Sequence, residues 1–161
     1  MNANQTITKR TALANALTMA AVAALALAIA PAAKAQGKGC STSTLKGTYA
    51  QKDTGFITSP PALAGPFAGV STVTFDGNGT VTSSGMVSLN GTIIPVTQKG
   101  TYTVNADCTG SYSVQIAPLG ISGHGFFVMD DSANELQILV TDSGLVVTCV
   151  AQRRFPKGYS E

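Results

Sequence analysis

Apolar and polar residues alternate along the central part of the chain, residues 70–114. In the first run Val73 and Phe75 share one face, and threonines occupy the positions between and before them. Val87 and Leu89 continue the alternation in the next run. An alternation with a period of two over this length predicts half-buried antiparallel strands.

Tight turns separate these runs. Asp76-Gly77-Asn78-Gly79 lies between the first and second runs, and Asn90-Gly91 lies between the second and third. Such pairs suit hairpin turns because Gly has no Cβ and Asn can bond its own backbone. A third strand is expected over Thr92–Thr97, and after a short loop a separate strand begins near Thr101.

The same pattern predicts strands on both sides of this centre. They are expected at about Leu45–Thr58, Phe67–Phe75, Ser111–Ile116, Ile121–Met129, Glu135–Thr141 and Leu145–Arg154. Ser59–Pro66 reads as a loop, since its prolines cannot donate to a strand ladder. Eight or nine short strands, joined mostly by short turns, predict an all-β fold.

A sheet with so many strands in a short chain must protect its edges. An antiparallel up-and-down β-barrel of about eight strands closes on itself, and sequential hairpins favour it over the alternative, a two-sheet β-sandwich. An eight-stranded barrel is just wide enough to be filled by side chains or to hold one small ligand. The absence of Trp favours a filled interior or a small cavity.

The N-terminal residues have the pattern of a secretory signal. Lys9-Arg10 precedes the apolar run Thr11–Ala30, and Ala33-Lys34-Ala35 fits the small-x-small cleavage rule. We therefore predict a signal peptide over residues 1–35 and a β-barrel domain over residues 36–161. The alternative is an uncleaved anchor, because the apolar run is just long enough to cross a bilayer. The expected location is secreted or periplasmic, with no membrane association after cleavage.

The net charge changes sign once the predicted signal peptide is removed. The whole chain has 10 Lys and Arg against 8 Asp and Glu, a formal net charge of +2. Lys9, Arg10 and Lys34 leave with the signal, so seven basic residues face eight acidic ones and the net charge becomes −1. The predicted domain therefore lacks the excess of positive charge that would attract nucleic acid. With one His in the chain and no Cys-x-x-Cys spacing, we expect no metal site and no cofactor.

Three cysteines lie in the predicted domain. An oxidising compartment favours one disulfide and leaves one thiol. Cys149 is in phase with Leu145 and Val147, which indicates a buried and inert thiol. Cys40 precedes the first strand and Cys108 lies in a turn, so we predict a Cys40–Cys108 disulfide.

Few residues suggest chemistry. Tyr49, Tyr102 and Tyr112 fall on the apolar phases of their strands, and a buried phenol needs a hydrogen-bond partner. They are candidates to line a cavity, with core packing as the alternative. His124 is a further ligand-binding candidate, but no Gly-x-Ser-x-Gly motif accompanies it, so an ordinary strand residue is the favoured interpretation. Most acids fall in predicted turns, and we assign no catalytic residue.

Four motifs together resemble a known group of proteins. They are Leu45–Tyr49, Thr74–Gly79, Gly100–Asn105 and Asp107–Gly110. The chain resembles small secreted bacterial proteins of unknown function, whose predicted shape is similar to the allene oxide cyclase and dirigent type of β-barrel. The resemblance covers most of residues 40–150 and implies that fold. No cyclase active-site motif is visible, so cyclase activity is implied by analogy alone.

Three functions are compatible with these patterns. The first is a barrel that binds a small apolar molecule without catalysis. The second is an isomerase or cyclase that shapes a reactive substrate by confinement, which needs few polar groups. The third is a structural or interaction protein with a packed interior.

Overall fold

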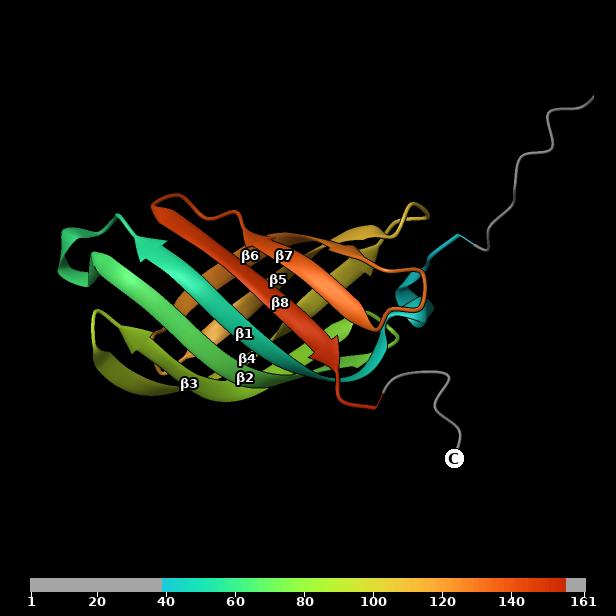
Figure 1. Ribbon diagram of the computed structural model, residues 1–161, viewed down its shortest axis with the longest axis horizontal. Coiled ribbons are helices and arrows are strands. Elements are labelled where there is room, and N and C mark those ends of the chain that lie inside the picture. The colour runs from blue at the N-terminus through green and yellow to red at the C-terminus, as the bar shows by residue number, and fades with distance from the viewer. Residues whose placement is uncertain (1–38, 156–161) are drawn as a thin grey trace, which may run out of the picture. The chain divides into compact units, whose positions relative to one another are not determined.

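The computed structural model of the chain describes residues 39–155. Within this range eight antiparallel strands form one closed barrel in sequential order (Figure 1). The strands are β1 (Lys46–Ile57), β2 (Gly65–Asp76), β3 (Thr80–Leu89), β4 (Thr92–Val104), β5 (Thr109–Ala117), β6 (Ile121–Met129), β7 (Glu135–Val140) and β8 (Leu145–Arg153). The predicted up-and-down barrel is confirmed and the sandwich alternative is wrong. The predicted signal peptide lies outside the described residues.

The barrel closes where its last strand meets its first. β8 pairs antiparallel with β1 from Tyr49↔Arg153 to Ile57↔Leu145. Figure 1 shows β8, in red, lying beside β1, in teal. Every strand therefore has a hydrogen-bonded neighbour on each side, which removes the exposed edges that an open sheet would present.

One predicted boundary is wrong. Thr92–Val104 forms a single strand, β4, rather than two strands with a loop between them. Gln98 pairs with Ser83 of β3 and with Ile116 of β5, so the ladder continues through the supposed loop. A Cβ at Gly100 would lie 1.9 Å from the carbonyl oxygen of Ser113. Glycine here lets β5 approach β4 closely, and the polar Gln98 faces inward instead of marking a break.

The predicted hairpin turns are present. Asn90 and Gly91 have φ angles of 48° and 87°, the positive values that a two-residue hairpin needs at both central positions. In the preceding turn, the Asp76 carboxylate accepts hydrogen bonds from the backbone N–H groups of Asn78 and Thr80 at 2.7 and 2.9 Å. The short polar side chains thus determine the local geometry, as the sequence indicates.

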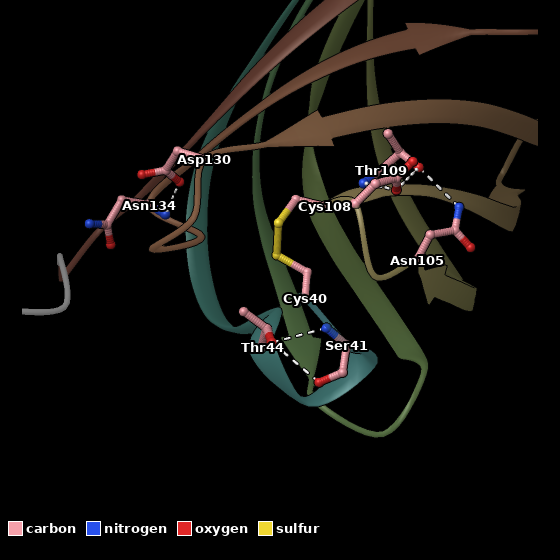
Figure 2. Close-up of a disulfide and its surroundings, with 9 residues drawn as sticks. Cys40, Ser41, Thr44, Asn105, Cys108, Thr109, Asp130 and Asn134 are labelled. Carbon is pink, nitrogen blue, oxygen red and sulfur yellow. Dashed lines mark hydrogen bonds between the residues drawn. A yellow bond between two sulfur atoms is a disulfide. The ribbon is translucent and has the colours of Figure 1, made fainter. Parts of the chain in front are cut away.

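The segment Cys40–Leu45, which we call the plug, closes one end of the barrel. It contains the 3-10 helix η2 (Thr42–Thr44). Figure 2 shows the Cys40–Cys108 disulfide that joins the plug to the β4–β5 turn, with the two Cα atoms 5.0 Å apart. The predicted disulfide is confirmed. It holds the plug against the barrel, assisted by a 3.1 Å hydrogen bond from Cys40 N–H to the carbonyl oxygen of Ala106.

Aromatic side chains fill the interior next to the plug. Phe75 makes edge-on contacts with Tyr49 and Tyr102, with ring centroids 5.5 and 5.0 Å apart. Leu45 of the plug is fully buried against this group, and so is Leu136. This end is therefore a packed core, and any space for a ligand must lie toward the opposite end.

Candidate ligand-binding site

A cavity of about 310 Å³ occupies the barrel interior away from the plug. Its lining includes Ser59 and Leu63 from the β1–β2 connection, Leu119 from the β5–β6 turn and Ser143 from the β7–β8 turn. These loops surround the barrel end opposite the plug. The cavity therefore reaches that end, which we call the mouth.

Most of the cavity lining is apolar. Inward-facing positions on several strands contribute aliphatic and aromatic side chains: Phe67, Val87, Val96, Val114, Ile138 and Val147. Because successive side chains in a strand point to opposite faces, the alternation seen in the sequence places these residues together inside the barrel. Such a surface suits the apolar part of a ligand.

A few polar side chains interrupt the apolar lining at mid-barrel. They are Gln51 and Asp53 from β1, Gln98 from β4, Tyr112 from β5 and Cys149 from β8. Asp53 is only 7% exposed, and its Oδ1 accepts a 2.7 Å hydrogen bond from Nε2 of Gln51. A carboxyl group is thus held inside a largely apolar chamber.

Cys149 lies beside Asp53 across the closing seam of the barrel. The two residues are register partners in the β1–β8 ladder, and the thiol is hydrogen-bonded to the Asp53 carboxyl group. Burial raises the pKa of the Cys149 thiol well above its usual range, and the charge of Asp53 raises it further. The thiol therefore stays protonated and donates to Asp53. The predicted buried, unpaired Cys149 is confirmed.

Tyr112 is the predicted site tyrosine that lines the cavity. Its ring lies against Gly125, where an added Cβ would come within 2.3 Å of a ring carbon. Burial is the main cause that raises the pKa of its phenol, and the negative charge of Asp53 raises it further. Within residues 39–155, no protein group forms a hydrogen bond with its hydroxyl, which leaves that group available to a ligand.

Tyr49 and Tyr102 lie near the plug and do not line the cavity. The Tyr49 hydroxyl donates to the carbonyl oxygen of Ala133, and burial raises the pKa of Tyr49 to about 12. The Tyr102 hydroxyl donates to the carbonyl oxygen of Leu45 at 2.6 Å and accepts from the N–H of Gly77 at 2.9 Å. Both phenols thus satisfy backbone groups at the plugged end, while a ligand role for either stays a prediction.

His124 lies on the outer face of β6 and is half exposed. Its Nδ1 is 2.6 Å from Oδ1 of Asp142, and its backbone N–H donates to Oδ2 of the same residue at 2.7 Å. Asp142 contributes to the cavity lining at the mouth. His124 therefore does not line the cavity itself. It holds the lining residue Asp142, in the β7–β8 turn, through two hydrogen bonds.

Asp53 is the site residue that sequence reasoning did not select. Most acids fall in predicted turns, but Asp53 lies within the first predicted strand, four residues after Tyr49 and four residues before Ile57. All three therefore face inward, because positions four apart in a strand share a face. A charged residue on an apolar phase was the available signal.

Comparison with known proteins identifies no family or relative, so the function must be inferred from the geometry of the cavity. No protein-family model matches the chain, and no curated protein has a matching sequence. Within residues 39–155, no three His, Cys, Asp or Glu side chains gather as a metal site would require. The same residues include no helix with the length and apolar character needed to cross a bilayer.

Proposed function

We propose that this protein acts outside the cytoplasm as a β-barrel that binds one small, largely apolar molecule in its cavity. The observation that carries the proposal is the apolar chamber of about 310 Å³ that reaches the barrel mouth. This volume is at the lower end of the range of about 300–1,000 Å³ that is usual for ligand pockets. A few polar groups at mid-barrel would orient the molecule.

The construction of the barrel favours binding over a purely structural role. The plug, the Cys40–Cys108 disulfide and the aromatic core make one end rigid, while side chains leave space at the other end. A cavity that is already formed avoids much of the ordering cost of binding. Burial of apolar ligand surface then contributes about 25 cal/mol per Å².

Native mass spectrometry of protein secreted by its own host tests the proposal. We expect a small molecule that remains bound in the gas phase and leaves on denaturation. In a parallel assay, purified protein should enhance the fluorescence of an apolar dye and lose the enhancement when a ligand displaces it.

Paired valine substitutions locate the binding. Val87 is 8% exposed and lines the cavity, whereas Val70 is 61% exposed on the outer face. Val87→Phe should weaken dye binding, because the larger ring occupies the cavity, and Val70→Phe should not. Circular dichroism establishes that both variants fold. Equal dye binding by both folded variants would contradict a cavity site.

A second function, an isomerase or cyclase, is favoured by one observation. The buried Asp53 carboxyl group faces the same space as the proposed ligand and lies beside the Cys149 thiol. A carboxylate beside a bound apolar substrate can act as a general base. Under this proposal, Asp53→Asn abolishes conversion of the captured molecule, followed by mass spectrometry and chromatography, while the molecule still binds. If wild-type protein returns the captured molecule unchanged, the enzyme proposal is wrong and only the binding function remains.

A further inference from the structure

We infer that the cavity selects an apolar molecule that carries a cationic amino group, and that Asp53 pairs with this group. The inference rests on the proposed ligand-binding function and specifies its ligand class. It follows from the charge balance around Asp53, the charges along the cavity lining and the position of Asp53 within the barrel.

The Asp53 carboxylate has no cationic partner within the described residues. Its hydrogen-bond partners are the neutral amide of Gln51 and the neutral thiol of Cys149. Between residues 39 and 155 the one contact between a basic and an acidic side chain is His124–Asp142, at the mouth and away from Asp53. A buried carboxylate that lacks an opposite charge is costly, and a positive group brought by a ligand would offset that cost.

The charged groups of the lining are all of one sign. Asp53 and Asp142 are both acidic, and no Lys, Arg or His side chain is among the described residues that line the cavity. Lys52, next to Asp53 in β1, is exposed on the outer face. Arg153 is engaged at the plugged end by Tyr49 and Ala133. The electrostatic potential inside therefore favours a cation and opposes a carboxylate ligand.

The position of Asp53 sets the orientation of the ligand. Toward the mouth lie apolar side chains, among them Ile57, Phe67 and Val87, and toward the plug lies the aromatic core. A molecule that enters through the mouth would place its amino group beside Asp53 and its apolar body between Asp53 and the loops. The Tyr112 hydroxyl, which also lines the cavity, would accept a second hydrogen bond from the ammonium group.

Three ligands with the same apolar chain test this inference: octylamine, 1-octanol and octanoate. Each is titrated into the purified, disulfide-bonded protein by isothermal titration calorimetry and by displacement of the apolar dye. Octylamine should bind about tenfold or more tightly than 1-octanol, since pairing of a desolvated charge contributes at least this much at close range. Octanoate should bind most weakly.

The variant Asp53→Asn removes the charge and keeps the shape of the side chain. It should bind octylamine no better than 1-octanol, while 1-octanol binding changes little. Asp142→Asn is the matched control, because it neutralises the other lining carboxylate, at the mouth. This variant should retain a preference for the amine.

The possible outcomes separate the two proposals. Octanoate binding as tight as that of octylamine in wild-type protein would overturn the inference, and this result needs no variant to fold. An amine preference that survives Asp53→Asn, or that disappears only in Asp142→Asn, would also overturn it. If 1-octanol and the dye bind without any amine preference, the apolar site stands and the inference fails. If the dye and all three ligands fail to bind, the proposed function itself fails.

Discussion

The guanidinium of Arg153 lies over the ring of Tyr49, with its central carbon 4.8 Å from the ring centroid. Its Nη2 donates to the Tyr49 hydroxyl at 2.6 Å, and its Nε donates to the carbonyl oxygen of Ala133 at 3.1 Å. The same carbonyl accepts from the Tyr49 hydroxyl. One side chain from the last strand thus joins the first strand and the β6–β7 turn at the plugged end of the barrel.

Loss of the Tyr49 hydroxyl should weaken this junction. Tyr49→Phe leaves the ring in place but removes a hydrogen-bond partner from both Arg153 and Ala133. We expect a loss of about 1–3 kcal/mol in the free energy of unfolding, because two hydrogen bonds are lost and one of them involves a charged group. Urea unfolding followed by circular dichroism measures it. Tyr112→Phe is the matched control and should change stability little, so equal losses in the two variants would contradict the assignment.

Removal of the disulfide should destabilise the whole barrel. Cys40 and Cys108 are 68 residues apart in the sequence, and the loop-closure model gives about 4 kcal/mol for a cross-link of this span. The double variant Cys40→Ala with Cys108→Ala should therefore unfold at much lower urea concentration than wild-type protein. Cys149→Ala is the control for losing one cysteine, and the double variant should be the less stable of the two.

The buried tyrosines should ionise at a higher pH than free tyrosine does. Burial raises the pKa of Tyr49 to about 12 and also raises those of Tyr102 and Tyr112 above the usual 10.0. A raised folded-state pKa means that the associated stability is complete below about pH 10 and is lost as the pH rises through the folded-state value. Tyrosinate absorbance in a pH titration should show these three groups ionising above pH 10 in folded protein. Ionisation of all tyrosines near pH 10, with the fold intact, would refute this.

The turn carboxylates should link stability to acid pH. Backbone N–H groups of Asn78 and Thr80 lower the pKa of Asp76 below 3.8, and hydrogen bonds from Thr109 do the same for Asp107. A lowered folded-state pKa gives stability that is present above the unfolded-state value and is lost as pH falls through the folded-state value. The urea concentration at the unfolding midpoint should therefore decrease as the pH is lowered below about 4. The double variant Asp76→Asn with Asp107→Asn should show a flatter acid dependence than wild type.

Cys149 should react slowly with thiol reagents in the folded protein. Its thiol pKa is raised first by burial and then by the charge and hydrogen bond of Asp53. Asp53→Asn removes the charge, so the pKa falls and the thiolate fraction at mildly alkaline pH increases. Alkylation followed by mass spectrometry should be faster in this variant. Rates in concentrated urea provide the control and should be equal, and a slower variant would rule out the coupling.

The sequence determined most elements of this fold because its signals are local, although it divided the single strand Thr92–Val104 into two. Alternation places Val73, Phe75 and Val87 on inward faces. Pairs such as Asn90-Gly91 specify hairpin turns because these two residues readily adopt the positive φ angles that such turns need. The Cys40–Cys108 pairing also followed from local context, since both residues flank strands while Cys149 lies within one. Closure then follows from a series of sequential hairpins, which brings β8 to β1.

The tertiary structure alone decided which part of the interior is hollow and which groups meet there. Tyr49, Tyr102 and Tyr112 have the same inward phase in the sequence, yet only Tyr112 lines the cavity. The difference arises because the plug and Phe75 fill the space beside the other two, and local periodicity carries no information about such filling. Asp53 meets Cys149 only through the register of the closing seam, a long-range pairing that no spacing within one strand encodes.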